Sequence, residues 1–189
     1  RCVMKYIGME KKEEGKFITR YDITYETGDC KEKVYEMISR NKNMTTREEL
    51  TDHPADSVVL MIHNEAGDKI LLNKEFRMAC GTFVYNVPAG LIDSGEDFRE
   101  SAARELKEET GLDLVRIDDV LGESFSAIGF SNEKNICIVG TAKGEFAPST
   151  SAAEEIEAKW FTKAEVRELL KKEYFAARTQ SYCYLWSKD

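Results

Sequence analysis

Three glutamates lie three and four residues apart near the middle of the chain: Glu105, Glu108 and Glu109. On a helix this spacing places their side chains on one face, where like charges repel one another. Because they would sit in its last turn, they would also oppose the helix dipole, and a bound divalent cation would relieve both costs. Carboxylate oxygens favour a hard ion such as Mg²⁺ or Mn²⁺ over zinc. The alternative is an ordinary solvated acidic face.

The helix that must position these glutamates is expected from about Gly95 to Thr110. Ser94 and Asp97 fit a capping box at its start, and Gly111 fits a left-handed cap at its end. Alternating and apolar patterns predict strands on both sides of it and two helices near the end of the chain. The expected strands are 2–7, 16–26, 33–40, 57–63, 69–75, 82–87, 115–124, 135–142 and 154–161, and the helices are 162–172 and 174–186. This mixed order predicts an α+β fold that begins with a small antiparallel meander.

Composition narrows the function classes. The chain has 189 residues, enough for one cooperative unit, and 42% hydrophobic with 33% charged residues is ordinary for a globular protein. A net charge of −8 argues against nucleic acid and anionic membranes as partners. The longest apolar run, 58–62, is too short to cross a bilayer and no signal-peptide pattern is present, so a soluble cytoplasmic protein is expected. With 2 histidines and 5 scattered cysteines, the chemistry must rest on carboxylates.

The acidic segment resembles the signature of the Nudix hydrolases over its complete length. Every fixed position and both apolar positions match; they are Gly90, Glu96, Arg104, Glu105, Leu106, Glu108, Glu109, Gly111 and Leu112. The resemblance implies an α/β/α sandwich for residues 54–189, with the signature as a loop, helix and loop. It implies that residues 1–53 form a small strand subdomain that builds a homodimer.

The resemblance also implies roles for individual residues. Glu105 and Glu109, with Glu108 assisting, resemble the family's Mg²⁺ ligands, with Mn²⁺ as the alternative ion, and the carbonyl of Ala89 could add another ligand. Four positions would be structural: Gly90 and Gly111, and Glu96 with Arg104 as a salt bridge between loop and helix.

Further segments resemble the branch of the family that contains ADP-ribose pyrophosphatases. In the run Glu75-Phe76-Arg77, Arg77 would contact substrate phosphates; a surface arginine is the alternative. Glu133 would be the general base that activates water, with Glu108 as the other catalytic candidate and a solvated loop glutamate as the alternative for Glu133. Two positions depart from the branch, where members that hydrolyse ADP-ribose commonly have proline and glutamate: Ala127 and Asn86.

The implied activity is Mg²⁺-dependent hydrolysis of the pyrophosphate bond in a nucleoside diphosphate linked to another group. ADP-ribose or a related nucleotide sugar is favoured as the substrate. Dinucleotide diphosphates are an alternative substrate class, and a Nudix-fold sensor that binds nucleotide without cleavage is an alternative function. A metal would also bridge an acidic protein and its polyanionic substrate, which makes the net charge compatible with a phosphate-rich small molecule.

Overall fold

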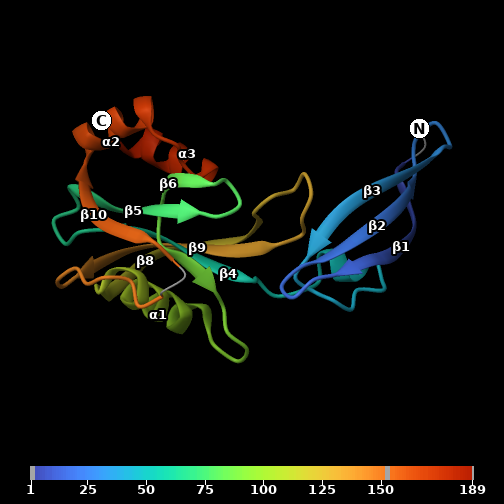
Figure 1. Ribbon diagram of the computed structural model, residues 1–189, viewed down its shortest axis with the longest axis horizontal. Coiled ribbons are helices and arrows are strands. Elements are labelled where there is room, and N and C mark those ends of the chain that lie inside the picture. The colour runs from blue at the N-terminus through green and yellow to red at the C-terminus, as the bar shows by residue number, and fades with distance from the viewer. Residues whose placement is uncertain (1–2, 152–153, 189) are drawn as a thin grey trace. The chain divides into compact units, whose positions relative to one another are not determined.

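The computed structural model describes residues 3–151 and 154–188, and the chain divides into two compact units (Figure 1). The first unit contains the chain up to Asp56 together with Glu123–Asn135. The second contains Ser57–Gly122 and the chain from Ile136 onward. The boundary after Asp56 lies close to the one expected at residue 53, but 123–135 were expected in the main domain because sequence order alone assigns them there.

The first unit is built on a three-stranded antiparallel sheet in the order β1-β2-β3. Alternate residues of β2 point to one side, where Tyr21 and Ile23 form a small core with Met37 and Met44. The expected meander is therefore confirmed. Its first strand continues beyond the expected 2–7, because the charged residues up to Glu14 also pair with β2. The elements are β1 (Lys5–Glu14), β2 (Thr19–Glu26), β3 (Glu32–Ser39) and the 3₁₀ helix η1 (Glu48–Leu50).

The segment 123–135 joins the first unit through β3. Ile38 forms a parallel bridge with Ser131, and its backbone N–H donates to the carbonyl of Phe130 at 2.8 Å. The hydroxyl of Tyr35 donates to the carbonyl of Gly129. These contacts extend the small sheet with a loop that comes from a distant part of the sequence.

The second unit contains a seven-stranded sheet with the order β10-β5-β4-β9-β8, in which β6 pairs with β5 and β7 with β4. Residues 123–125 of β8 and residues 134–135 of β9 are counted with the first unit. The elements are β4 (Ser57–His63), β5 (Lys69–Arg77), β6 (Thr82–Asn86), β7 (Ala89–Leu91), α1 (Phe98–Thr110), β8 (Asp113–Phe125), β9 (Lys134–Lys143), β10 (Ile156–Thr162), α2 (Lys163–Lys172) and α3 (Ala177–Trp186).

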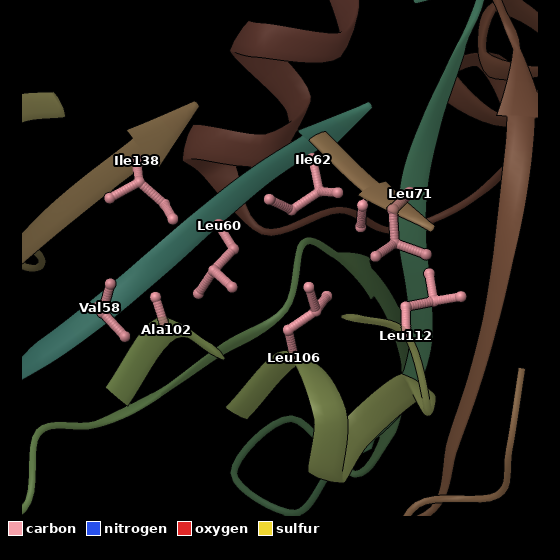
Figure 2. Close-up of a cluster of buried hydrophobic side chains, with 9 residues drawn as sticks. Val58, Leu60, Ile62, Leu71, Ala102, Leu106, Leu112 and Ile138 are labelled. Carbon is pink, nitrogen blue, oxygen red and sulfur yellow. The ribbon is translucent and has the colours of Figure 1, made fainter. Parts of the chain in front are cut away.

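Both faces of this sheet are covered by helices, which confirms the expected α/β/α sandwich. Residues Val58, Leu60 and Ile62 of β4 pack with Leu106 and Leu112 on the α1 side, as Figure 2 shows. The intervening residues of the same strand pack toward α2 and α3 on the other side. Burial on both faces explains why β4 is a continuous apolar run instead of an alternating one. Among the described residues, no helix is both long and apolar enough to cross a membrane.

Helix α1 begins later than expected. Gly95 has a φ of 88°, so the chain turns there and cannot be helical from Ser94 onward. The helix instead begins after Asp97, whose side chain accepts from the backbone of Arg99 at 2.9 Å, while the Glu100 carboxylate accepts from the backbone of Asp97 at 3.1 Å. The capping box is therefore one turn further along than the one expected at Ser94. Gly111 ends the helix with a φ of 80°, as expected.

The last helix is also shorter than the expected 174–186. Residues 174–176 pair with β6 instead, because the backbone N–H of Tyr85 donates to the carbonyl of Tyr174 at 2.8 Å and that of Ala176 donates to the carbonyl of Tyr85 at 3.0 Å. Helix α3 therefore begins at Ala177. The capping box of α2, formed by Thr162 and Glu165, is as the sequence predicts.

Candidate active site

Glu109 lies near the end of α1 with only 5% of its surface exposed. Asn73 on β5 donates its side-chain amide to the Glu109 carboxylate, with 2.7 Å between Nδ2 and Oε2. Burial raises the pKa of Glu109 well above its ordinary value, and the charges of Glu75, Glu105 and Glu154 raise it further. A carboxylate in this position is costly to ionise unless a cation offsets its charge.

Glu105 lies one turn before Glu109 and packs against Gly90 of β7. A Cβ on Gly90 would lie 1.9 Å from the carboxyl carbon of Glu105, so any other residue here would displace the Glu105 carboxylate from this position. Arg104 donates to Glu105 at 2.8 Å between Nη1 and Oε1. Burial nevertheless raises the pKa of Glu105, because it outweighs the favourable charge of Arg104.

Two further carboxylates belong to this group, and neither was assigned a metal or catalytic role from the sequence. Glu75 is 7% exposed and lies two residues from Asn73, so both side chains are on the face of β5 that α1 covers. Burial raises the pKa of Glu75 although Asn86 donates to it at 3.0 Å. Glu154 precedes β10, and its charge raises the pKa values of Glu75, Glu105 and Glu109.

Glu108 differs from its two neighbours in the signature because 48% of its side chain is exposed. Its carboxylate forms an ion pair with Arg104, with 3.4 Å between Oε2 and Nη1. Helical spacing brings Glu108 beside Glu105 but places it on the solvent side of the carboxylate group. Glu75, Glu105, Glu109 and Glu154 are called the carboxylate cluster below.

The cluster fits a hard divalent cation in its chemistry. Its donors are all oxygens, and burial, helped by the neighbouring negative charges, raises the pKa values of Glu75, Glu105 and Glu109. The Oδ1 atom of Asn73, beside Glu109, is buried and has no hydrogen-bond partner. Within residues 3–151 and 154–188, no three His, Cys, Asp or Glu side chains form a ready-made metal cage. Asn73 donates to Glu109 and Arg104 donates to Glu105 in this arrangement.

Glu96 and Arg104 join the loop before α1 to the helix. The guanidinium donates twice to the carboxylate, at 3.0 Å from Nε to Oε1 and at 2.9 Å from Nη2 to Oε2. Arg104 and the Ser101 hydroxyl lower the pKa of Glu96 to about 2. Arg104 also donates to the carbonyl of Leu91 at 3.1 Å. Such a two-point contact fixes an angle as well as a distance, which keeps the loop in place beside Glu105.

The remaining candidate residues have different surroundings. The Arg77 side chain is 58% exposed, and its Nη1 lies 3.7 Å from the Glu75 carboxylate. Ala89 is on β7, opposite Val59 of β4. Glu133 belongs to the first unit, where its carboxylate accepts from Nε of Arg40 at 2.6 Å.

The two positions that depart from the ADP-ribose pattern also have defined contacts. Asn86 donates to Glu75 and accepts from the hydroxyl of Thr179 at 2.8 Å. Its amide thus faces a carboxylate on the neighbouring strand. The carbonyl of Ala127 accepts from the backbone of Phe130 at 3.0 Å and of Ser131 at 2.9 Å. The loop therefore closes as a tight turn without proline.

Comparison with known proteins identifies the family. The NUDIX domain model matches residues 53–182, and the chain therefore belongs to the Nudix family. It shares 46% identity over 72 residues with an ADP-ribose pyrophosphatase of Saccharomyces cerevisiae, covering 38% of this chain and 30% of that protein. An ADP-ribose pyrophosphatase of Bacillus subtilis is 31% identical over 88 residues, covering 47% of this chain and 46% of that protein. These matches span less than half of either relative.

A solved structure shares the fold. The crystal structure of an ADP compounds hydrolase superimposes with a TM-score of 0.70 at 22% sequence identity, covering 98% of this chain and 94% of that chain. At this identity the likeness concerns the fold, which supports the assignment of a Nudix sandwich together with a small N-terminal sheet.

Proposed function

We propose that the protein hydrolyses the pyrophosphate bond of a nucleoside diphosphate linked to another group, with ADP-ribose or a related nucleotide sugar as substrate and Mg²⁺ as the metal. The observation that supports this most is the carboxylate cluster, in which burial and mutual repulsion raise the pKa values of Glu75, Glu105 and Glu109. The names of the relatives from yeast and Bacillus subtilis favour ADP-ribose.

In this proposal Glu105 and Glu109 hold the cation, with Glu108 and the carbonyl of Ala89 as additional ligands. When bound, the metal would neutralise phosphate oxygens and lower the pKa of a water. Gly90 lets the Glu105 carboxylate approach the backbone of β7, within the space that a Cβ would occupy. The protein residues therefore place charge beside the pyrophosphate and keep the loop fixed against the helix.

Arg77 is proposed to bind a substrate phosphate, because its guanidinium is exposed and lies beside Glu75. Glu133 is proposed as the general base, with Glu108 as the other candidate, on the resemblance to the family alone. In the first unit, the Arg40 ion pair orients the Glu133 carboxylate. We expect Glu133→Gln to lower kcat by about 10²- to 10⁴-fold with little change in KM. An unchanged kcat would assign the base to another residue.

We also propose a homodimer built by the sheet of the first unit, in keeping with the family branch. Edge strands present backbone groups that a second copy can pair with, and β1 is at the edge of this sheet. Light scattering would give a mass near twice 21.6 kDa if this is correct. A mass near that of one chain would contradict it.

A substrate panel tests the proposed function. Purified protein with Mg²⁺ would be given ADP-ribose, other nucleotide sugars and dinucleotide diphosphates, and the phosphate-containing products would be separated and measured. We expect fastest turnover of ADP-ribose or a nucleotide sugar, loss of turnover with a chelator, and loss in Glu109→Gln. Metal-independent binding with every ligand recovered intact would instead favour a sensor without catalysis.

A further inference from the structure

A cavity of about 700 Å³ lies beside the carboxylate cluster in the second unit. Its walls come from the ends of β5 and β6 and from residues 174–176. Glu75 and Asn86 belong to both the cavity wall and the surroundings of the cluster. One end of a ligand in this cavity would therefore lie near the position proposed for the metal. A cavity of this size holds a small organic ligand.

The strand faces determine which side chains enter the cavity. Glu75 and Arg77 are two residues apart on β5, so their side chains lie on the same face of the strand. Thr82 and Asn86 are four residues apart on β6 and share a face for the same reason. All four line the cavity. It therefore offers one exposed cation and polar groups near its acidic end.

Tyr174 provides an aromatic surface in this cavity. Both Tyr174 and Phe175 line the cavity, and Phe175 is held by stacking on Tyr85 with 5.5 Å between ring centroids and 27° between planes. Tyr174 is 71% exposed. The main chain of residues 174–176 is nevertheless fixed to β6, because the carbonyl of Tyr174 and the N–H of Ala176 both form hydrogen bonds with the backbone of Tyr85. A fixed backbone with an exposed ring is well suited to stacking, because little freedom is lost on binding.

We propose that this cavity binds the nucleoside half of the substrate, with its aromatic base stacked on Tyr174 and its phosphate end toward Arg77 and Glu75. The inference rests on the proposed function and deepens it by assigning the base to a place in the fold. An aromatic ring and a cationic group in the same cavity match a nucleotide, which has a flat aromatic base at one end and negative charge at the other.

Cys80 allows a test that does not depend on activity or metal. It lines the cavity as an exposed thiol, whereas Cys183 is fully buried. Metal-free protein would be alkylated with and without adenosine, and the modified peptides quantified by mass spectrometry. We expect adenosine to slow alkylation of Cys80, ribose at the same concentration to have no effect, and Cys183 to stay unmodified. Equal rates at Cys80 with adenosine and with ribose would overturn the proposal.

A pair of tyrosine variants provides the second test. Tyr174→Ala should weaken adenosine binding and raise KM for ADP-ribose about tenfold, which is the size expected for loss of one stacked base. Tyr174→Phe should restore both. Tyr184→Ala is the matched control, because Tyr184 is 53% exposed on α3 and does not line this cavity.

These results separate the inference from the function on which it rests. If the wild type hydrolyses ADP-ribose and Tyr174→Ala leaves KM and adenosine binding unchanged, the base site is wrong and the proposed function stands. If no diphosphate is hydrolysed while adenosine still protects Cys80 and Tyr174→Ala abolishes that protection, the base site stands and the proposed function is wrong.

Discussion

Replacing Glu109 with glutamine should stabilise the metal-free protein and abolish its activity. Glu109 is 5% exposed, and burial together with neighbouring carboxylates raises its pKa. Glutamine has nearly the same shape, keeps an oxygen that accepts from Nδ2 of Asn73, and has no charge. Its amide can also donate to Oδ1 of Asn73, which is buried without a partner.

The expected stabilisation combines two contributions. A new hydrogen bond to a buried acceptor is worth about 1 kcal/mol. For each pKa unit by which folding raises the pKa of Glu109, ionising Glu109 lowers the free energy of unfolding of the wild type by about 1.4 kcal/mol, and glutamine avoids this loss. The hydrogen bond alone corresponds to a rise in Tm of about 2–4 °C for a chain of this size, and the relief of the ionisation cost adds to that rise.

The sign of the pH dependence makes the assay specific. Because folding raises the pKa of Glu109, the folded state retains this proton to higher pH than the unfolded state does, and wild-type stability falls as the pH rises through that interval. The Tm advantage of Glu109→Gln should therefore grow from about pH 4.5 upward and then level off. Scanning calorimetry in the presence of a chelator would measure it.

Glu108→Gln is the matched control for this prediction. It removes the same charge from a side chain that is 48% exposed, so stability should change by no more than about 0.5 kcal/mol. If Glu109→Gln were less stable than the wild type at pH 7 without metal, or if both variants behaved alike, the electrostatic reasoning about the cluster would be refuted.

Three further predictions concern the loop, the ion pair and the metal. Gly90→Ala should lower kcat about 100-fold with an unchanged circular dichroism spectrum, because its Cβ would displace Glu105; an unaffected kcat would exclude close packing there. The stabilisation from the ion pair between Glu96 and Arg104 is present above about pH 4.5 and is lost as the pH falls toward the folded pKa of Glu96, about 2. In urea unfolding, Glu96→Gln should therefore have a lower free energy of unfolding than the wild type at pH 7 and the same free energy near pH 2. A difference that stays constant with pH would contradict this. Mg²⁺ at ten times its Kd should stabilise the wild type by about 1.4 kcal/mol in thermal melts, and an equal shift in Glu109→Gln would place the ion elsewhere.

Local sequence signals predicted the signature helix well because its ends are determined by nearby residues. Gly111 adopts the left-handed conformation that glycine permits, and the helix ends there. The start was placed one turn early, since both Ser94 and Asp97 are followed three residues later by an acidic side chain. The choice between them depends on the turn at Gly95, which the local pattern does not determine.

Long-range pairing was harder to predict. Glu75 and Glu154 join the cluster because β10 pairs with β5, with Ile156 opposite Glu75, and no motif connects these positions in the sequence. Likewise, 123–135 belong to the first unit through a bridge between Ile38 and Ser131. Such contacts bring together residues far apart in the chain, and composition or periodicity has no information about them.

The most direct test of the central claim is ³¹P NMR of ADP-ribose incubated with the protein. With Mg²⁺, the wild type should convert the two pyrophosphate signals into those of two phosphate monoesters, AMP and ribose 5-phosphate, and Glu109→Gln should leave the pyrophosphate signals unchanged. Persistence of the pyrophosphate signals with the wild type, or equal conversion by Glu109→Gln, would contradict the assignment of the carboxylate cluster as a metal-dependent catalytic site.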